Sequence, residues 1–332
     1  MNTCAIKRRQ ALINLGLLGI SGLPRLATAS EPADSWPSGP SRIIVPYAAG
    51  ASTDVVSRRL AMSLTQKLGQ SFFVENKPGA NGVIGIGTVV REKADGGTFV
   101  ISDTTITMVP SMRKDMPYDV TQDLVPIAAF FFSPFGVVVN ADSPYKTLQD
   151  LIDAARKAPG TLGFGSGGEG SSPHLATEDF SGKAGVQLLH VPYKGAGDAI
   201  NALMGNQISL QFATPSTAIG NVKGGRLRML AISGERRLDL LPDVPTFKEA
   251  GLPSFQFSNW QGLFARRGTS DTIVQKLSAQ VEKIMQDDEM SKFAAGLGAN
   301  TNCITGEPLR RMIASELVRW KSVTERMGFA KK

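Results

Sequence analysis

The sequence is poor in the residues that build disulfide frameworks and metal sites. Its 332 residues include two cysteines and two histidines. Cys4 lies in an N-terminal segment that we expect to be removed, which leaves Cys303 alone and excludes an internal disulfide in the mature chain. His174 and His190 are sixteen positions apart and have no cluster of acidic or sulfur ligands around them. We therefore predict no metal site and no cofactor.

The chain also lacks an unbroken apolar run that could span a bilayer. The most apolar stretch, residues 11–26, is interrupted by asparagine, three glycines and proline, whereas a spanning helix needs about twenty apolar residues. Basic residues 7–9 precede this stretch, and the small residues 27–29 follow it, a pattern typical of a secretory signal peptide. We predict cleavage near Ala29, by either the general or the twin-arginine export route, with a retained membrane anchor as the alternative.

A strong excess of one charge sign is absent once this segment is set aside. The whole chain has 36 basic and 29 acidic residues and a net charge of +7. Residues 1–29 carry four basic residues and no acids, so the mature chain keeps seven minus four, or +3. This modest charge gives no support to a nucleic-acid partner.

The remaining sequence alternates short apolar runs with longer amphipathic stretches. This alternation predicts an α/β fold with mainly parallel sheets in two Rossmann-like units, and the length is typical of two domains. An extended run over 129–139, with Pro134 in its middle, leads from the first unit to the second. The predicted strands are 43–45, 72–74, 96–102, 162–164, 188–191, 208–212, 222–234 and 259–269. The predicted helices are 53–68, 174–180, 198–204, 273–285 and 309–323, together with a short helix after the loop 76–82 and a helix that follows a turn within 143–160.

Glycine-rich turns join several of these strands to the helices that follow, and open α/β sheets bind ligands at such turns. In the first turn, "YAAGASTD" over 47–54, small residues leave the amide N–H groups of the helix start uncovered. A carboxylate or phosphate would be stabilised there. Alternatively, Ser52 or Thr53 simply caps the helix. The charge of Asp54 competes with an anion, so we assign Asp54 a positioning role.

The second turn has the spacing G-x-G-x-x-G at Gly165, Gly167 and Gly170. A dinucleotide site would also need an acidic residue at the end of the next strand, where this chain reads "LLHVPYKG". We therefore reject nucleotide binding. The serine hydroxyls of the turn, together with glycine amides, instead suit a carboxylate that has no cationic partner.

A hydrolase interpretation starts from the same turn. Gly170, Ser172 and His174 come close to a nucleophile elbow, but His174 stands where that motif needs glycine. We expect His174 and His190 to be packing residues. A serine hydrolase using Ser172 and His174, and a protein-binding module, remain the alternative functions.

Six segments together carry a resemblance: "IIVPYAAGASTDVVSRRLA", "VENKPGANGVIG", "GSGGEGSSPHLATE", "HVPYKGAGDAINALMGNQ", "LPDVPTFKEAGLP" and "NWQGLFARRGT". In this order and spacing the chain resembles the Bug-type periplasmic substrate-binding receptors of tripartite tricarboxylate transporters. The resemblance runs from about Trp36 to the C-terminal helix. It implies a type II periplasmic binding protein, in which two α/β domains joined by two crossing strands close over a ligand.

The resemblance also implies domain boundaries and a function. Residues 31–136 plus 255–332 would form domain 1, and residues 137–254 domain 2. The implied protein is a monomeric periplasmic receptor without catalytic activity or cofactor, which binds a di- or tricarboxylate or an aromatic carboxylate. Its implied partners are the membrane subunits of a tripartite carrier or the outer domain of a sensor kinase. Which acid is bound stays open.

In that family, main-chain amides and hydroxyls of facing turns hold the carboxylate groups. The expected ligand-binding residues of this chain come from both turns, from the "VPYKGAG" segment and from two neighbouring loops: Tyr47, Ala49, Gly50, Ala51, Ser52, Thr53, Asp54, Asn81, Ser102, Ser166, Gly167, Gly168, Ser171, Ser172, His174, Tyr193, Gly195 and Ala196.

Overall fold

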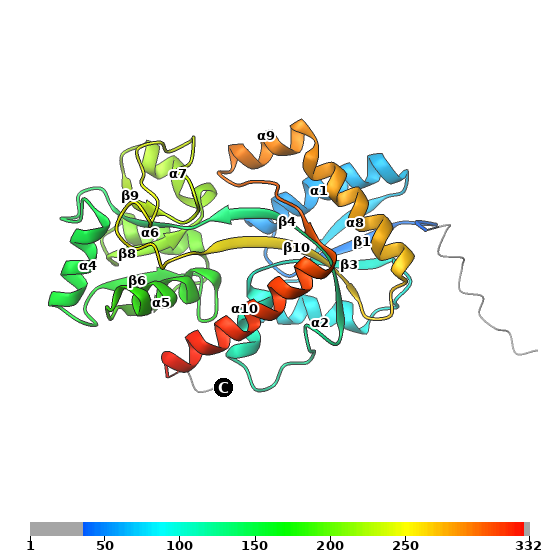
Figure 1. Cartoon of the computed structure of the whole chain (residues 1–332), viewed down its shortest axis with the longest axis horizontal. Helices are drawn as coiled ribbons and strands as arrows, with labels where there is room; N and C mark the ends of the chain where they lie inside the picture. The colour runs from blue at the N-terminus through cyan, green and yellow to red at the C-terminus, as the bar shows by residue number, and fades with distance from the viewer. Residues whose placement is uncertain (1–35, 329–332) are drawn as a thin grey trace, which may run out of the picture. The chain divides into compact units, whose positions relative to one another are not determined.

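The structure is a computed structural model that describes residues 36–328 (Figure 1). The expected signal peptide and Cys4 lie outside the described residues, so cleavage near Ala29 stays a prediction. Within residues 36–328, none of the helices combines the length and the apolar character that a membrane span requires.

The first of two sheets has six strands in the order β11-β4-β10-β3-β1-β2. Helices α1 and α8 cover one face of this sheet, and α2 and α10 cover the other. We call this sheet with its helices the first lobe. Its strands are β1 (Ser41–Val45), β2 (Phe72–Asn76), β3 (Thr98–Asp103), β4 (Leu124–Pro134), β10 (Ser258–Arg266) and β11 (Ile304–Thr305). Its helices are α1 (Ser52–Leu68), α2 (Val83–Arg91), α3 (Thr105–Met108), α8 (Asp271–Gln286), α9 (Asp288–Gly296) and α10 (Gly306–Arg326).

The second sheet has five strands in the order β7-β6-β8-β5-β9. Helices α4 and α5 pack against one face of the sheet, and α6 and α7 against the other. This is the second lobe. Its strands are β5 (Gly136–Asn140), β6 (Gly163–Ser166), β7 (Leu189–Pro192), β8 (Leu210–Ala213) and β9 (Leu227–Ile232). Its helices are α4 (Leu148–Lys157), α5 (Ser172–Ala184), α6 (Ala196–Met204) and α7 (Pro215–Lys223).

Strand β1 shows why these apolar runs form central strands. Ile43 and Val45 point into the core under α1 and α8, whereas Ile44 points into the core under α2 and α10. All three side chains are fully buried. A strand buried on both faces needs a continuous apolar run, which this segment supplies.

The predicted α/β fold in two units is confirmed, but the sheets are mixed rather than mainly parallel. β1 pairs in parallel with β2 and β3, and β6 pairs in parallel with β7 and β8. The pairings of β4, β5, β9, β10 and β11 are antiparallel. The chain leaves the first sheet on β4 and returns to it on β10, so these two strands run in opposite directions and pair antiparallel.

The chain crosses between the two sheets twice, after β4 and before β10, and the hydroxyl of one serine is hydrogen-bonded to both crossings. β4 and β10 pair in antiparallel fashion along their length in the first sheet, and Figure 1 shows β4 leading to the second sheet and β10 leading back from it. Beyond their ends, the hydroxyl of Ser233 accepts a hydrogen bond from the N–H of Phe135 at 2.9 Å and donates to the carbonyl of Phe257. The domain boundaries at residues 136/137 and 254/255 stay a prediction.

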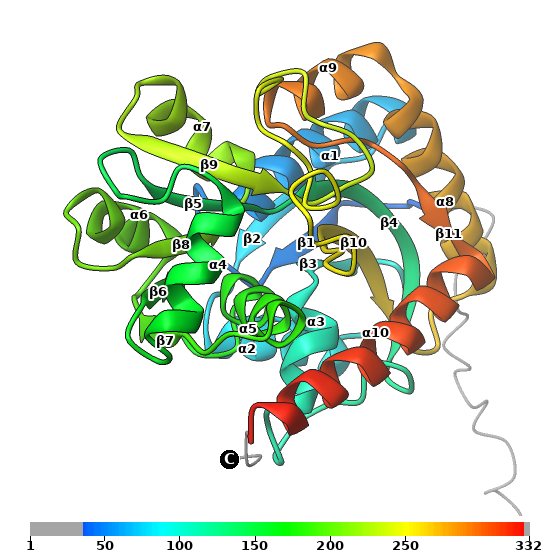
Figure 2. The same ribbon diagram turned by 60° about the vertical axis from the view of Figure 1, so that its left-hand side comes forward.

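Helix α10 belongs to the packing of both lobes. Leu309 and Ile313 are buried in the core under α2, while Trp320 and Val323 are buried in the core of the second lobe. Arg319 on the same helix donates to the buried Asp179 of α5 at 2.6 Å. Figure 2 shows α10 running past α3 toward α5.

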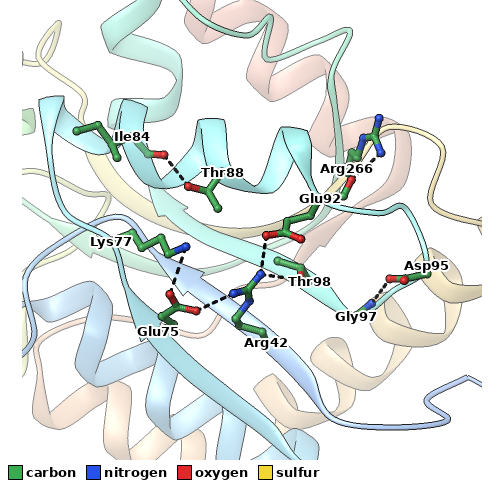
Figure 3. Close-up of polar contacts among 10 residues, drawn as sticks. All are labelled: Arg42, Glu75, Lys77, Ile84, Thr88, Glu92, Asp95, Gly97, Thr98 and Arg266. Atoms are coloured by element: carbon green, nitrogen blue, oxygen red, sulfur yellow. Dashed lines mark hydrogen bonds and ion pairs between the residues drawn. The ribbon is translucent and has the colours of Figure 1, made fainter.

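A polar network joins β1, β2 and the end of β10 to the end of α2 (Figure 3). The guanidinium of Arg42 on β1 donates to Glu75 of β2 at 2.9 Å and to Glu92 after α2 at 2.7 Å. Arg266 at the end of β10 donates to the carbonyl of Glu92 at 2.6 Å and so satisfies the carboxyl end of α2.

Three helices were not predicted from the sequence: α3, α7 and α9. α3 is a four-residue turn of helix. α7 follows Thr214 and begins at Pro215, and a threonine followed by proline is a helix-start signal that could have been recognised. A single residue, Asp287, separates the end of α8 from the start of α9, so the periodicity of the two helices runs together.

Candidate functional site

A cavity of about 650 Å³ lies between loops of the two lobes. It is lined by the starts of four helices, α1 from the first lobe and α5, α6 and α7 from the second, together with the end of β3. Each of these segments follows the carboxyl end of a strand or forms that end. This is the position where open α/β sheets bind ligands.

The start of α1 presents unpaired amide groups to this cavity. Ala51 is the N-cap residue and makes no side-chain hydrogen bond, so neither Ser52 nor Thr53 caps the helix as the alternative interpretation proposed. Gly50 has φ +82°, and a Cβ atom at Gly50 would meet no atom within 4 Å. The first-turn N–H groups therefore remain available to an anion.

Asp54 does not line the cavity but supports the turn through hydrogen bonds to its carboxylate. Its Oδ2 accepts a hydrogen bond from the N–H of Gly50 at 2.9 Å, and Asn76 donates to Oδ1 at 2.9 Å. Arg58 forms an ion pair with the same carboxylate at 2.9 Å. Burial alone would raise the pKa of Asp54, but the hydrogen bonds from Arg58, Gly50 and Asn76 outweigh burial and hold that pKa below its usual value.

The second-lobe turn has the same arrangement with a neutral acceptor. Gly170 has φ +81°, and its N–H donates to Nδ1 of His174 at 3.0 Å. The ring of His174 stacks on that of His190 with centroids 3.8 Å apart, and Ser166 is hydrogen-bonded to His190 at 2.7 Å. Burial, and then the neighbouring His190, lower the pKa of His174 to about 3. His174 is therefore neutral, as an acceptor must be.

The helix starts in the second lobe also lack side-chain caps. Gly195 is the N-cap residue of α6. Ser171 precedes α5, but its hydroxyl donates backward to the carbonyl of Gly168 at 2.7 Å. Thr214 precedes α7, and its hydroxyl lies 2.9 Å from that of Ser216. At all four helix starts, backbone N–H groups that no side chain caps therefore face the cavity. The prolines of α5 and α7 are the exceptions, because proline has no N–H.

One carboxylate lines the cavity. Asp103 ends β3, and its Oδ1 accepts hydrogen bonds from the hydroxyl of Tyr47 at 2.6 Å, from the N–H of Thr105 at 2.9 Å and from the hydroxyl of Thr105 at 2.6 Å. Burial and the negative charge of Asp103 raise the pKa of Tyr47 well above its usual value, so the phenol stays protonated and donates.

Direct contacts join the two lobes beside the cavity. The side-chain amide of Asn81 donates to the carbonyl of Glu169. The hydroxyl of Thr104 donates to Asn259 at 2.6 Å and lies 3.2 Å from the hydroxyl of Ser172. These contacts bring the loops after β2, β3 and β6 against one another.

The structure brings most of the predicted site residues together at the cavity. Those that line it are Tyr47, Gly50, Ala51, Ser52, Thr53, Asn81, Gly167, Ser171, Ser172, Gly195 and Ala196. Several others lie behind the lining, where they support it: Asp54 as described, Ser102 against Tyr47, and Ser166 against His190. Ala49, Gly168, His174 and Tyr193 are also absent from the lining, and Tyr193 packs against the core around α6.

Other lining residues were not predicted. They include Asp103, Thr105, Lys194, Thr214, Ser216, Thr217 and Asn259. The sequence "SDTT" follows an apolar strand, as "ATPST" does, and polar residues at the carboxyl end of a strand are a signal that could have identified Asp103 and Thr214.

The hydrogen bonds of Ser172 and His174 go to other groups than a serine hydrolase would need. His174 uses Nδ1 to accept the Gly170 N–H, and its Nε2 faces Glu178 at 4.0 Å. Ser172 instead contacts Thr104. The serine that does contact an imidazole, Ser166, is fully buried. Among residues 36–328, no group of three or more histidine, cysteine, aspartate or glutamate side chains is arranged to hold a metal ion.

Comparison with known proteins gives the family. A family model described as "TctC: Tripartite tricarboxylate transporter family receptor" matches residues 56–329. The chain belongs to this family. Among curated proteins, protein BugT of Bordetella pertussis (strain Tohama I) is 33% identical over 316 residues, which cover 95% of this chain and 97% of BugT. The resemblance to Bug-type receptors is confirmed, and this TctC-family protein is a solute-binding receptor and not an enzyme.

Solved structures agree with this assignment. The periplasmic binding protein BugD aligns with a TM-score of 0.79 and 29% identity over 90% of this chain and 100% of BugD. R. palustris Rpa4515 with adipate aligns with a TM-score of 0.82 and 30% identity over 90% of this chain and 100% of that chain. MatC from Rhodopseudomonas palustris with bound malate gives a TM-score of 0.76 and 27% identity over 87% of this chain and 99% of MatC.

Proposed function

We propose that this TctC-family receptor captures a small carboxylic acid in the cavity between its lobes and delivers it to the membrane subunits of a tripartite carrier. The receptor would work in the periplasm after removal of its signal peptide. A sensor-kinase outer domain is the second partner that the resemblance suggests. The ligands of the two R. palustris structures, adipate and malate, are both dicarboxylates, which supports an acid as the ligand of this chain.

One observation carries the proposal: four helix starts without side-chain caps line the same cavity. Each helix N-terminus has a partial positive charge and free donors. A carboxylate would accept hydrogen bonds from the open amides of α1 and α6 and from the hydroxyls of Ser216 and Thr217. The cavity volume of about 650 Å³ is within the usual range for small-molecule sites.

The test is calorimetric titration of the mature protein with carboxylic acids, after unfolding and refolding to remove any ligand that copurifies. Gly50→Leu places a side chain in open space at the first turn, in front of the α1 amides. Loss of several hydrogen bonds to a charged group should weaken binding by about a hundredfold or more.

Gly69→Leu is the matched control. Gly69 has φ +69°, its added Cβ would also meet nothing within 4 Å, and it ends α1 outside the cavity lining. Both variants therefore carry a similar backbone strain, and only Gly50→Leu should lose binding. Equal affinities of the two variants for an acid that the wild type binds would show that the acid does not reach the α1 turn, and binding of no acid at all by the wild type would overturn the proposed function.

A further inference from the structure

The cavity contains a carboxylate that the capture of an acid does not explain. Asp103 ends β3 and lines the same cavity as the four helix starts. A negative side chain at this place repels the carboxylate of a ligand and so works against the helix N-termini. Asp103 can contribute to binding only if the ligand also brings a group that donates a hydrogen bond to it.

The hydrogen bonds of Asp103 leave one of its oxygens for such a group. The bonds from Tyr47 and Thr105 all end on Oδ1, so none of them uses Oδ2. Asp103 is half-buried and takes part in none of the ion pairs found within residues 36–328. The basic residue in the lining, Lys194, is exposed and also forms none of these ion pairs.

The electrostatic setting of Asp103 also favours a donor. Burial raises the pKa of Asp103, although the hydrogen bonds from Thr105 and Tyr47 act in the opposite direction. A carboxylate that is partly withdrawn from water and has no cationic partner is destabilised, and a donor from the ligand reduces that cost. The protonated phenol of Tyr47 fixes Oδ1 on one side and so orients the carboxylate.

We infer that Asp103 is a specificity-determining residue that selects carboxylic acids carrying an additional hydrogen-bond donor, a hydroxyl or an ammonium group, over unsubstituted acids of the same length. The inference rests on the proposed function: one carboxylate of the ligand binds at the helix starts, and the donor binds Oδ2 of Asp103. A residue with this role sets the substrate class of the receptor.

The experiment compares matched acids by calorimetric titration. At four carbons the set is succinate, malate and aspartate; at five it is glutarate, 2-hydroxyglutarate and glutamate; at six it is adipate and 2-aminoadipate. A hydrogen bond to a charged group should make the wild type prefer the substituted acid by about tenfold or more at the length that fits. Preference for the hydroxy acid or for the amino acid then identifies the donor.

Asp103→Asn tests whether Asp103 causes the preference. The side chain keeps its size but loses its charge, so the preference should fall to within about threefold, while the unsubstituted acid should bind as well as before or better. Asp115→Asn is the control, because Asp115 is an exposed acid outside the cavity lining, and it should keep the wild-type ratio. If Asp103→Asn does not fold, as judged by circular dichroism, Asp103→Ser removes the same charge and should give the same loss of preference.

Two results would overturn the inference while leaving the proposed function in place: equal affinity of the wild type for substituted and unsubstituted acids, or an unchanged preference in the Asp103 variants. Failure of the wild type to bind any acid in the set would overturn the proposed function and the inference with it.

Discussion

The two glycine-containing turns at the cavity, one from each lobe, use the same geometry with different chemistry. In each, a glycine with positive φ, +82° at Gly50 and +81° at Gly170, precedes a helix, and its N–H donates to the side chain four residues later. The acceptor is the carboxylate of Asp54 in the first lobe and the imidazole of His174 in the second. This shared geometry leaves the first N–H groups of the helix open to the cavity. The side chain that accepts the glycine N–H only has to supply a lone pair, so a carboxylate and a neutral imidazole both serve.

The difference between the acceptors lies in how each is kept in the right protonation state. Asp54 stays ionised because Arg58, Asn76 and Gly50 donate to it. His174 stays neutral because it is buried and stacked on His190. The first turn therefore depends on charge and the second on exclusion of charge, and the two should respond differently to pH and to substitution.

The largest expected effect is on the pH dependence of stability. The pKa of His174 is lowered to about 3 in the folded protein, so the unfolded chain binds a proton there as pH falls below 6.5 and the folded protein does not. Stability from neutral His174 is complete above pH 6.5 and is lost toward pH 3. Relative to His174→Asn, which keeps an acceptor but does not titrate, the wild type should lose about 3 kcal/mol of unfolding free energy between pH 7 and pH 4.

Denaturant unfolding at several pH values measures this difference. Asp54 is present in both proteins, so its own titration cancels from this difference. Glu178 faces His174 and has a pKa raised by burial, so both proteins should also be measured with Glu178→Gln. A difference between wild type and His174→Asn that stays constant with pH would mean that the folded protein and the unfolded chain take up the His174 proton at the same pH.

A smaller effect is expected when the charged turn loses its acceptor. Asp54→Ala leaves the N–H of Gly50 and the amide of Asn76 without this partner, which should cost about 2 kcal/mol of unfolding free energy at pH 7. Asp54→Asn keeps an oxygen acceptor and should cost clearly less. If the two variants were equally destabilised, the charge pairing with Arg58, and not the bond to Gly50, would be the main contribution of Asp54.

The smallest expected effect is the difference in stability between alanine variants of the two glycines, Gly50 and Gly170. Alanine at either position adopts an unfavourable positive φ at a cost of about 1 kcal/mol. At Gly50 the added Cβ meets open space, whereas at Gly170 it would lie 2.9 Å from Nδ2 of Asn81 and 3.2 Å from Sδ of Met112. Gly170→Ala should therefore be more destabilising than Gly50→Ala by about 1 kcal/mol, measured by thermal unfolding. Equal losses would show that Asn81 moves aside without cost.

The sequence was sufficient for features that depend on local pattern. Apolar runs identified the central strands, and the glycine-rich segments identified the turns at their ends. Contacts between segments that are far apart in the sequence could not be predicted from it. The partnership of Tyr47 with Asp103 arises because β1 and β3 are neighbours in the sheet, and the stacking of His174 on His190 joins α5 to β7. Neither follows from spacing along the chain, because strand order is set by packing of the whole lobe.

Helix α10 affects how the protein unfolds. Proteins with two lobes can lose them one at a time, each lobe melting at its own temperature. Here Trp320 and Val323 complete the core of the second lobe from a helix whose other half, at Leu309 and Ile313, completes the first. If either core melts, α10 loses half of its packing contacts, and the other core then loses the part of α10 that completes it. We therefore expect the two lobes to unfold together in one cooperative transition.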